Sequence, residues 1–192
     1  MKKMLYALVM AWKYRKNLAD YRCLSALQKR EVITLNPFSL KQEGVKLMIL
    51  DFDGVLAAFG ETIISPPIEN WVIRCRDIFG FGNIFILTNR PTQERQQYLS
   101  ERLPGVEFFW ASRKKPYPDG ILSIMHLKAV APAEVLVIDD RLLTGILAAV
   151  LANVRGCYIT EPLVSFRKRP IRELFFVLLR TIERFVFRRL RR

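Results

Sequence analysis

The sequence predicts an α/β fold, a parallel sheet flanked by helices, on two observations. Four short apolar runs of the kind that form buried strands alternate with segments whose apolar residues have helical spacing. Residues that can take part in catalysis or bind a metal follow these runs, at the point where each strand would end. Open parallel sheets bind ligands at this edge. The expected strands are 45–50, 83–87, 106–110 and 134–138, and the expected helices are 68–79, 91–103, 120–130 and 142–153.

Composition indicates one domain with extensions at both ends. The chain has 192 residues, of which 51% are hydrophobic, enough for one ordinary core. Its net charge of +13 is uneven: residues 1–49 carry +7, residues 50–164 carry −2, and residues 165–192 carry +8. We therefore predict three parts: a basic N-terminal helical extension (1–34), an α/β domain (35–165) and a basic amphipathic C-terminal helix (166–192). Basic arms favour polyanions, either nucleic acid or an anionic membrane surface.

The two arms have apolar as well as basic character. Residues 4–12 form an apolar run that ends at Lys13, far short of the roughly 20 residues of a spanning helix, so we expect a surface or interfacial helix. After Pro170, apolar residues recur at helical spacing, which is typical of a helix lying in a membrane interface. The alternative is a helix packed on the domain with a solvated basic face. The apolar positions are Ile171, Leu174, Phe175, Leu178, Leu179, Ile182, Phe185 and Val186, and the opposite side carries Arg180, Glu183, Arg184 and Arg188.

Cysteine and histidine usage excludes several classes of site. The three cysteines are widely spaced and show neither a disulfide framework nor zinc-ligand spacing, which fits a reducing, cytoplasmic setting. His126 is the one histidine and lies in an expected helix, so a Ser/His/Asp triad is not indicated.

The first strand ends in a pair of carboxylates, Asp51 and Asp53, within Asp-Phe-Asp-Gly. One carboxylate can attack an electrophile while the other handles protons on the leaving group. A carboxylate that attacks a phosphate ester meets like charge, so a divalent cation is needed, and Mg²⁺ suits oxygen ligands. Alone, this tetrapeptide is equally the pattern of a solvated turn or a fragment of a calcium loop.

Later strand ends supply complementary groups. Thr88 offers a hydroxyl to a phosphoryl oxygen, Lys115 offers a positive charge, and Asp140, assisted by Asp139, supplies a further acid. Each could be an ordinary loop or cap residue. Because they follow successive strands in order, we expect them to converge at one edge of the sheet.

Four segments together resemble a known family. They are ILDFDGVL from Ile49, LTNR from Leu87, KKPYP from Lys114 and VIDDRLLTG from Val137. In this order they resemble the motifs of the haloacid dehalogenase-like (HAD) phosphatases, and most closely the class IIIA, YqeG-type group related to phosphatidylglycerophosphate phosphatases. The resemblance covers residues 35–165.

The resemblance implies a Rossmann-like fold and a role for each motif residue. Asp51 would be the nucleophile and Asp53 the general acid/base, whose backbone carbonyl also binds the metal. Thr88 and Lys115 would hold the phosphoryl group, with Asn89 and Arg90 binding substrate. The metal, Mg²⁺, would be held by Asp51, Asp53 and Asp140.

The sequence departs from the family pattern in three respects. Gly54 and Val55 replace an Asn and a Thr, and Arg90 replaces an Asn. The second acid of the last motif falls on Gly145, while Asp139 stands where glycine is usual. Asp139 is therefore the candidate to compensate at the metal site.

Motif spacing bears on the substrate. The gaps of 37, 27 and 25 positions between Asp51, Thr88, Lys115 and Asp140 leave no room for a large cap domain. An uncapped site suits a phosphate carried on something large. We expect a phosphomonoester hydrolase acting on a phospholipid phosphate at the inner face of a membrane, to which it binds peripherally. Two alternatives remain: a nucleic-acid end phosphatase, and a non-catalytic phosphate-binding or scaffold protein. No protein partner is inferable.

Overall fold

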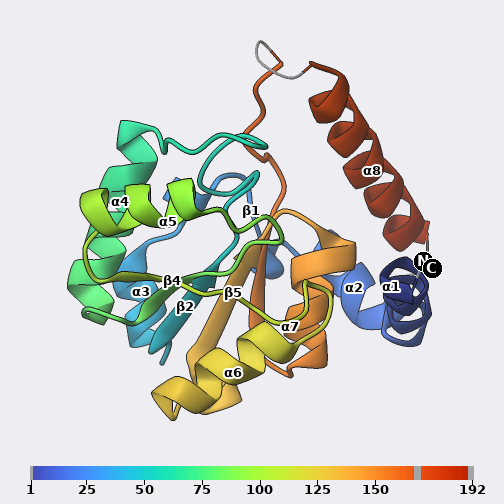
Figure 1. The fold of residues 1–192 in the computed structure, drawn as a ribbon. Coiled ribbons are helices and arrows are strands. Elements are labelled where there is room, and N and C mark those ends of the chain that lie inside the picture. Colours follow the sequence, from blue (N-terminus) through green and yellow to red (C-terminus); the bar gives the residue numbers. More distant parts are fainter. Residues whose placement is uncertain (1, 167–169, 190–192) are drawn as a thin grey trace.

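A six-stranded parallel sheet is the centre of the molecule (Figure 1). The structure is a computed structural model that describes residues 2–166 and 170–189. Within these residues the strand order is β1-β6-β5-β2-β3-β4, and every neighbouring pair is parallel. The strands are β1 (Gln28–Lys29), β2 (Leu47–Leu50), β3 (Ile84–Ile86), β4 (Val106–Phe108), β5 (Val135–Asp139) and β6 (Arg155–Ile159).

Helices cover both faces of the sheet, because strand side chains alternate between them. Met48 and Leu50 of β2 face the core that contains α4, whereas Leu47 and Ile49 face the core that contains α6. The first face is covered by α3 (Pro37–Gln42), α4 (Pro66–Phe79) and α5 (Gln93–Arg102), and the second by α6 (Asp119–Lys128) and α7 (Leu147–Leu151). The α/β fold expected from the sequence is confirmed.

All four expected strands and four expected helices are present, with shifted ends. The helix expected over 142–153 is composite: it starts as a π-helix (Leu142–Ile146) and continues as α7. The π turn is closed by the Ile146 N–H donating to the Arg141 carbonyl. Strands β1 and β6 were not expected, and β6 escapes a search for apolar runs because it starts with Arg155 and Gly156.

The terminal helices pack together beside β6. They are α1 (Lys2–Lys13), α2 (Arg15–Cys23) and α8 (Pro170–Arg189). Their shared core joins Ala11, Leu18 and Phe187 to Leu142 of the π-helix and Tyr158 of β6. No helix of the described residues is long and apolar enough to cross a membrane.

Helix α8 packs on the domain through its charged side. Glu173, Arg180 and Glu183 are buried, whereas the apolar Leu174 and Leu178 are 63% and 56% exposed. The amphipathic helix expected from the sequence is present, but the side that the alternative interpretation assigned to solvent is the side that contacts the protein. Residues 167–169 and 190–192 of the predicted segment, and the Arg188 side chain, lie outside the described part.

Candidate active site

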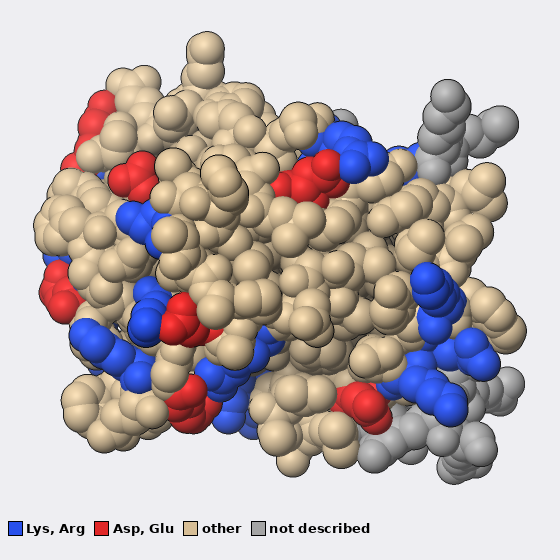
Figure 2. Space-filling model, turned by 90° about the horizontal axis from the view of Figure 1, so that it is seen from below, with Lys and Arg blue, Asp and Glu red and all other residues tan. Residues whose placement is uncertain are grey.

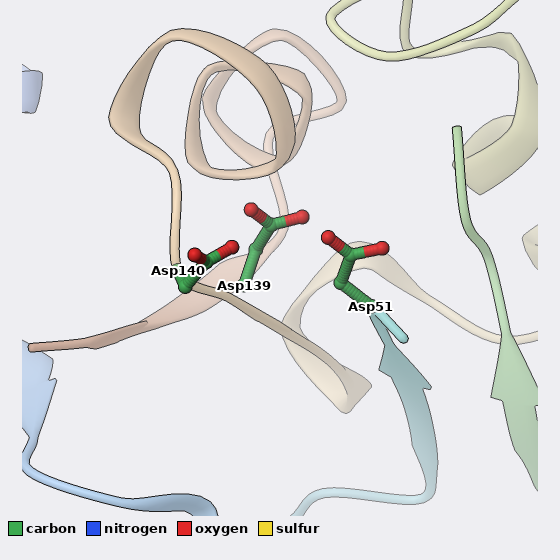
Figure 3. A group of neighbouring side chains, drawn as sticks. All are labelled: Asp51, Asp139 and Asp140. Carbon is green, nitrogen blue, oxygen red and sulfur yellow. The ribbon is translucent and has the colours of Figure 1, made fainter. Parts of the chain in front are cut away.

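Three carboxylates meet at the carboxyl ends of two neighbouring strands (Figure 3). Asp51 follows β2, Asp139 ends β5, and Asp140 comes next. One oxygen from each lies within 4.8 Å of the others. Like charges this close repel, so the arrangement requires positive charge nearby.

Lys115 supplies part of that charge from the loop before α6. Its buried Nζ lies 2.6 Å from Asp139 Oδ2 and 3.0 Å from Asp51 Oδ1. Burial opposes the charge on this amine, but Asp139 and Asp51 outweigh burial and raise the pKa of Lys115 above its ordinary value. The ammonium therefore stays charged and ties the two acids together.

Burial also acts on the carboxylates themselves. It raises the pKa of Asp51 well above its ordinary value; Lys115 opposes this rise, and Asp139 and Asp140 add to it. The pKa of Asp140 is raised to about 6, again by burial, with Arg180 opposing. Burial and mutual repulsion therefore disfavour the ionised forms of Asp51 and Asp140. A bound cation would stabilise these ionised forms.

The three acids fit a divalent cation. Both carboxylate oxygens of Asp140 are buried without a hydrogen-bond partner, although Oδ2 forms an ion pair with Arg180. Such orphaned oxygens carry a desolvation cost that a metal ion would offset. An all-carboxylate oxygen set is the kind that Mg²⁺ accepts. Asp51, Asp139 and Asp140 could therefore hold a metal ion.

Asp53 is turned toward a different cation. Both of its carboxylate oxygens accept hydrogen bonds from Arg95, at 2.6 and 3.1 Å, and one also accepts from the Gly60 N–H at 2.8 Å. Arg95 is buried, and it is further anchored by the Glu61 carbonyl. This bidentate pair fixes the orientation of Asp53 beside the acid cluster.

The other expected residues border the same space. A cavity of about 180 Å³ is lined by Asp51, Asp53, Thr88, Asn89, Arg90 and Asp140. The Asn89 amide donates to the Lys115 carbonyl at 3.1 Å, and the Arg90 guanidinium stacks over the Phe59 ring. All eight residues predicted from the sequence thus lie in or against one site.

Sequence reasoning missed several residues of this site. Arg95 resembled any charged residue of a polar helix, and Arg141 follows the last acidic motif without a pattern of its own. Phe176 and Arg180 belong to α8, where helical spacing places Arg180 on the charged side but does not show that this side faces the site. All four lie at the site: Arg141, Phe176 and Arg180 line the cavity, and Arg95 holds Asp53.

Position 145 cannot carry a side chain while Asp139 keeps its place. A Cβ atom on Gly145 would lie 1.8 Å from Asp139 Oδ2, far inside van der Waals contact. Asp139 has little freedom to move away, because Lys115 holds Oδ2 and the Arg141 N–H donates to Oδ1 at 2.9 Å. A side chain at 145 therefore forces the Asp139 carboxylate out of its present position.

We predict that Gly145→Ala destabilises the protein by about 1–3 kcal/mol through overpacking. In an Asp139→Gly background the same change is expected to be neutral or stabilising, because alanine favours helix over glycine by about 1 kcal/mol. Urea unfolding followed by circular dichroism measures both. Additive effects in the double variant would contradict the proposed clash, whose coupling energy should reach about 0.5–3 kcal/mol.

Comparison with known proteins places the chain in a family. The family model described as mitochondrial PGP phosphatase matches residues 18–164. A solved structure, titled an uncharacterized protein from Corynebacterium glutamicum, is 17% identical with a TM-score of 0.48; the alignment covers 72% of this chain and 96% of that one. No curated protein sequence matches. The chain therefore belongs to the mitochondrial PGP phosphatase family, a family of HAD-like phosphatases, and is a phosphatase.

Proposed function

We propose that this phosphatase hydrolyses phosphomonoesters through an aspartyl-phosphate on Asp51, depends on Mg²⁺, and acts on a membrane phospholipid phosphate such as phosphatidylglycerophosphate. The observation that carries the proposal is the position of Asp51. Its carboxylate lies at a strand end, 3.0 Å from the Lys115 ammonium and beside Asp139 and Asp140. These are the charges that a carboxylate nucleophile needs to approach an anionic phosphoryl group.

The reaction divides into two steps at Asp51. A carboxylate oxygen attacks phosphorus, the bond from phosphorus to the ester oxygen breaks, and the alcohol leaves. Water then attacks the acyl phosphate and releases inorganic phosphate, which restores Asp51. Mg²⁺ bound by Asp51, Asp139 and Asp140 would neutralise charge between nucleophile and phosphoryl oxygens. Lys115 compensates the remaining negative charge.

Asp53 is the candidate to move the proton in both steps. It would give a proton to the leaving alkoxide and take one from the attacking water. Oδ1 of Asp53 accepts from both Arg95 and Gly60, whereas Oδ2 accepts one hydrogen bond, from Arg95, so Oδ2 is the oxygen with a lone pair left for the proton. Thr88, Asn89 and Arg90 border the space in which the phosphoryl oxygens would lie.

The size of the cavity supports a lipid substrate presented from outside. A space of about 180 Å³ accepts a phosphorylated head group but not acyl chains. The chains of a phospholipid would therefore stay in the bilayer while the head group enters. The matched family is named for PGP phosphatase, which supports phosphatidylglycerophosphate as the head group.

Two helices bordering the site support an anionic membrane as partner. Tyr6 of α1 stacks on Tyr117, next to the Lys115 loop, and Phe176 of α8 stacks on Phe59 at the cavity. Both helices turn apolar side chains outward, including Leu5 and Trp12 of α1, each 65% exposed. The remaining exposed apolar residues are Met4, Leu8 and Val9 of α1 and Ile171, Leu174, Phe175, Leu178, Ile182, Phe185 and Val186 of α8.

Charge on this side of the molecule fits an anionic surface. The terminal segments carry most of the net charge of +13. In Figure 2, basic side chains near α1, α2 and α8 have few acidic neighbours, whereas on the other side of the visible face the two signs are interspersed. Each basic residue near an anionic bilayer contributes about 1 kcal/mol to binding. This arrangement supports peripheral attachment through apolar faces with basic surroundings.

Asp51→Asn is expected to abolish hydrolysis of p-nitrophenyl phosphate, because an amide cannot form the acyl phosphate. Asp53→Asn should lower the rate by about 10²- to 10⁴-fold through lost proton transfer. Turnover is measured with Mg²⁺ on purified protein whose circular dichroism matches wild type. Wild-type-like turnover by Asp51→Asn would exclude the covalent route, and an inactive wild type would favour a non-catalytic phosphate-binding role.

Chelation is expected to remove activity and Mg²⁺ to restore it. Asp140→Ala should raise the Mg²⁺ concentration for half-maximal activity or eliminate turnover, and Asp139→Ala should raise that concentration if Asp139 is a ligand.

Protons and metal compete for Asp140, whose pKa is raised to about 6 by burial, so Mg²⁺ affinity should weaken as pH falls below that value. Isothermal titration calorimetry at two pH values measures this change in Mg²⁺ affinity. In the Asp139→Ala variant, an unchanged Mg²⁺ titration would assign Asp139 a structural role.

Leu174→Glu/Leu178→Glu should weaken binding to anionic liposomes at least about tenfold, since full burial of one leucine contributes about 1.5–3 kcal/mol. Both residues are exposed on α8, so hydrolysis of p-nitrophenyl phosphate should persist. The matched control is Leu122→Glu/Leu127→Glu, two exposed leucines of α6. Cosedimentation reads out binding, and equal binding by wild type and the α8 variant would refute membrane docking by this face.

A further inference from the structure

Helix α8 reaches the active site through one buried arginine. The Arg180 side chain is only 4% exposed, and its Nε lies 2.7 Å from Asp140 Oδ2. Arg180 lines the cavity that holds Asp51 and Asp53. It lies beyond residues 18–164, the part that matches the family model. A feature peculiar to the C-terminal segment thus contacts one of the proposed metal ligands.

The ion pairs around the site identify Arg180 as the partner of Asp140. Lys115 pairs with Asp51 and Asp139, and Arg141 pairs with Glu183. Asp53 pairs with Arg95. Among the described residues, Arg180 is the cation whose ion pair involves Asp140. Without it, Asp140 would be a buried carboxylate with no ion pair in this structure, an arrangement that proteins rarely tolerate.

The contact also orients the Asp140 carboxylate. Arg180 approaches Oδ2, and Gly54 also packs so closely that a Cβ there would lie 2.5 Å from the same oxygen. The Arg180 N–H is not aligned for a hydrogen bond, so the contact is an ion pair that fixes position by charge. Oδ1 is buried without a hydrogen-bond partner.

We propose that Arg180 is a positioning residue of the phosphatase site: from α8 it holds the Oδ2 edge of Asp140 and leaves Oδ1 available to the metal. This inference rests on the proposed function, in which Asp140 is a metal ligand. Groups that hold a ligating carboxylate in place typically contribute 10- to 100-fold to metal affinity.

Arg180 can be tested without detaching α8, because other residues anchor the helix. Glu183 accepts from the Leu142 N–H at 3.0 Å, and Glu173 accepts from the Phe59 and Ser165 N–H groups. Arg184 donates to the Tyr158 hydroxyl at 2.9 Å and to the Thr160 carbonyl. Arg184 does not line the cavity and is therefore the matched control for losing an arginine from this face of the helix.

The experiment is isothermal titration of Mg²⁺ into the full-length wild type, Arg180→Ala, Arg180→Gln and Arg184→Ala. Both Arg180 variants are expected to bind Mg²⁺ about 10- to 100-fold more weakly. For p-nitrophenyl phosphate, the Mg²⁺ concentration for half-maximal rate should rise by the same factor, with most of kcat recovered at saturating Mg²⁺. Arg184→Ala should bind Mg²⁺ like wild type. Circular dichroism confirms folding, and Arg180→Gln, which keeps much of the side-chain volume, serves if the alanine variant unfolds.

Two results would overturn the proposal. Wild-type affinity in a folded Arg180 variant would show that Asp140 needs no positioning by α8. Tighter Mg²⁺ binding would show that Arg180 instead occupies the place of the metal. Failure of the proposed function is distinguishable, because it would appear as a wild type without Mg²⁺-dependent turnover, whereas the binding comparison requires no turnover.

Discussion

The site depends on charge balance at one edge of the sheet. Three carboxylates, those of Asp51, Asp139 and Asp140, lie within 4.8 Å of one another with little access to water. Lys115 bridges two of them, and Arg180 contacts the third. Parallel strands bring these acids together without any contribution from their charges, because β2 and β5 are neighbours that end at the same edge. The buried cations offset the repulsion among these carboxylates. Lys115 reaches the site from a loop, and Arg180 reaches it from the C-terminal helix α8.

Helix α8 contacts the active site with one side and exposes apolar residues to solvent on the other. The inward side of α8 carries Glu173, Arg180 and Glu183, each buried against loops of the active site. Its outward side carries exposed leucine, isoleucine and phenylalanine side chains. In most surface helices the apolar side packs inward. The reversal leaves an apolar surface facing solvent while ionic contacts hold the helix, and this exposed surface is the one that we propose to dock on a bilayer.

The order of apolar runs and motifs along the chain was enough to predict most of the fold and the acid cluster. Apolar runs located β2, β3, β4 and β5, and the residues after them converge as expected. The short strand β1 and the polar start of β6 carry no such run. Arg95 and Arg180 could not be found from the sequence, because a buried arginine looks like a solvated one until its acid partner is placed. Their partners Asp53 and Asp140 lie 42 and 40 positions away in the chain, a separation at which spacing has no predictive value.

The crowding between Asp139 and Gly145 also constrains how such a site can change over time. A side chain at 145 has no room while Asp139 stays, since its Cβ would lie 1.8 Å from that carboxylate. The two positions therefore act as a unit. The free-energy cost of a side chain at 145 depends on whether a carboxylate stands at 139, so neither position can be changed without altering what the other tolerates.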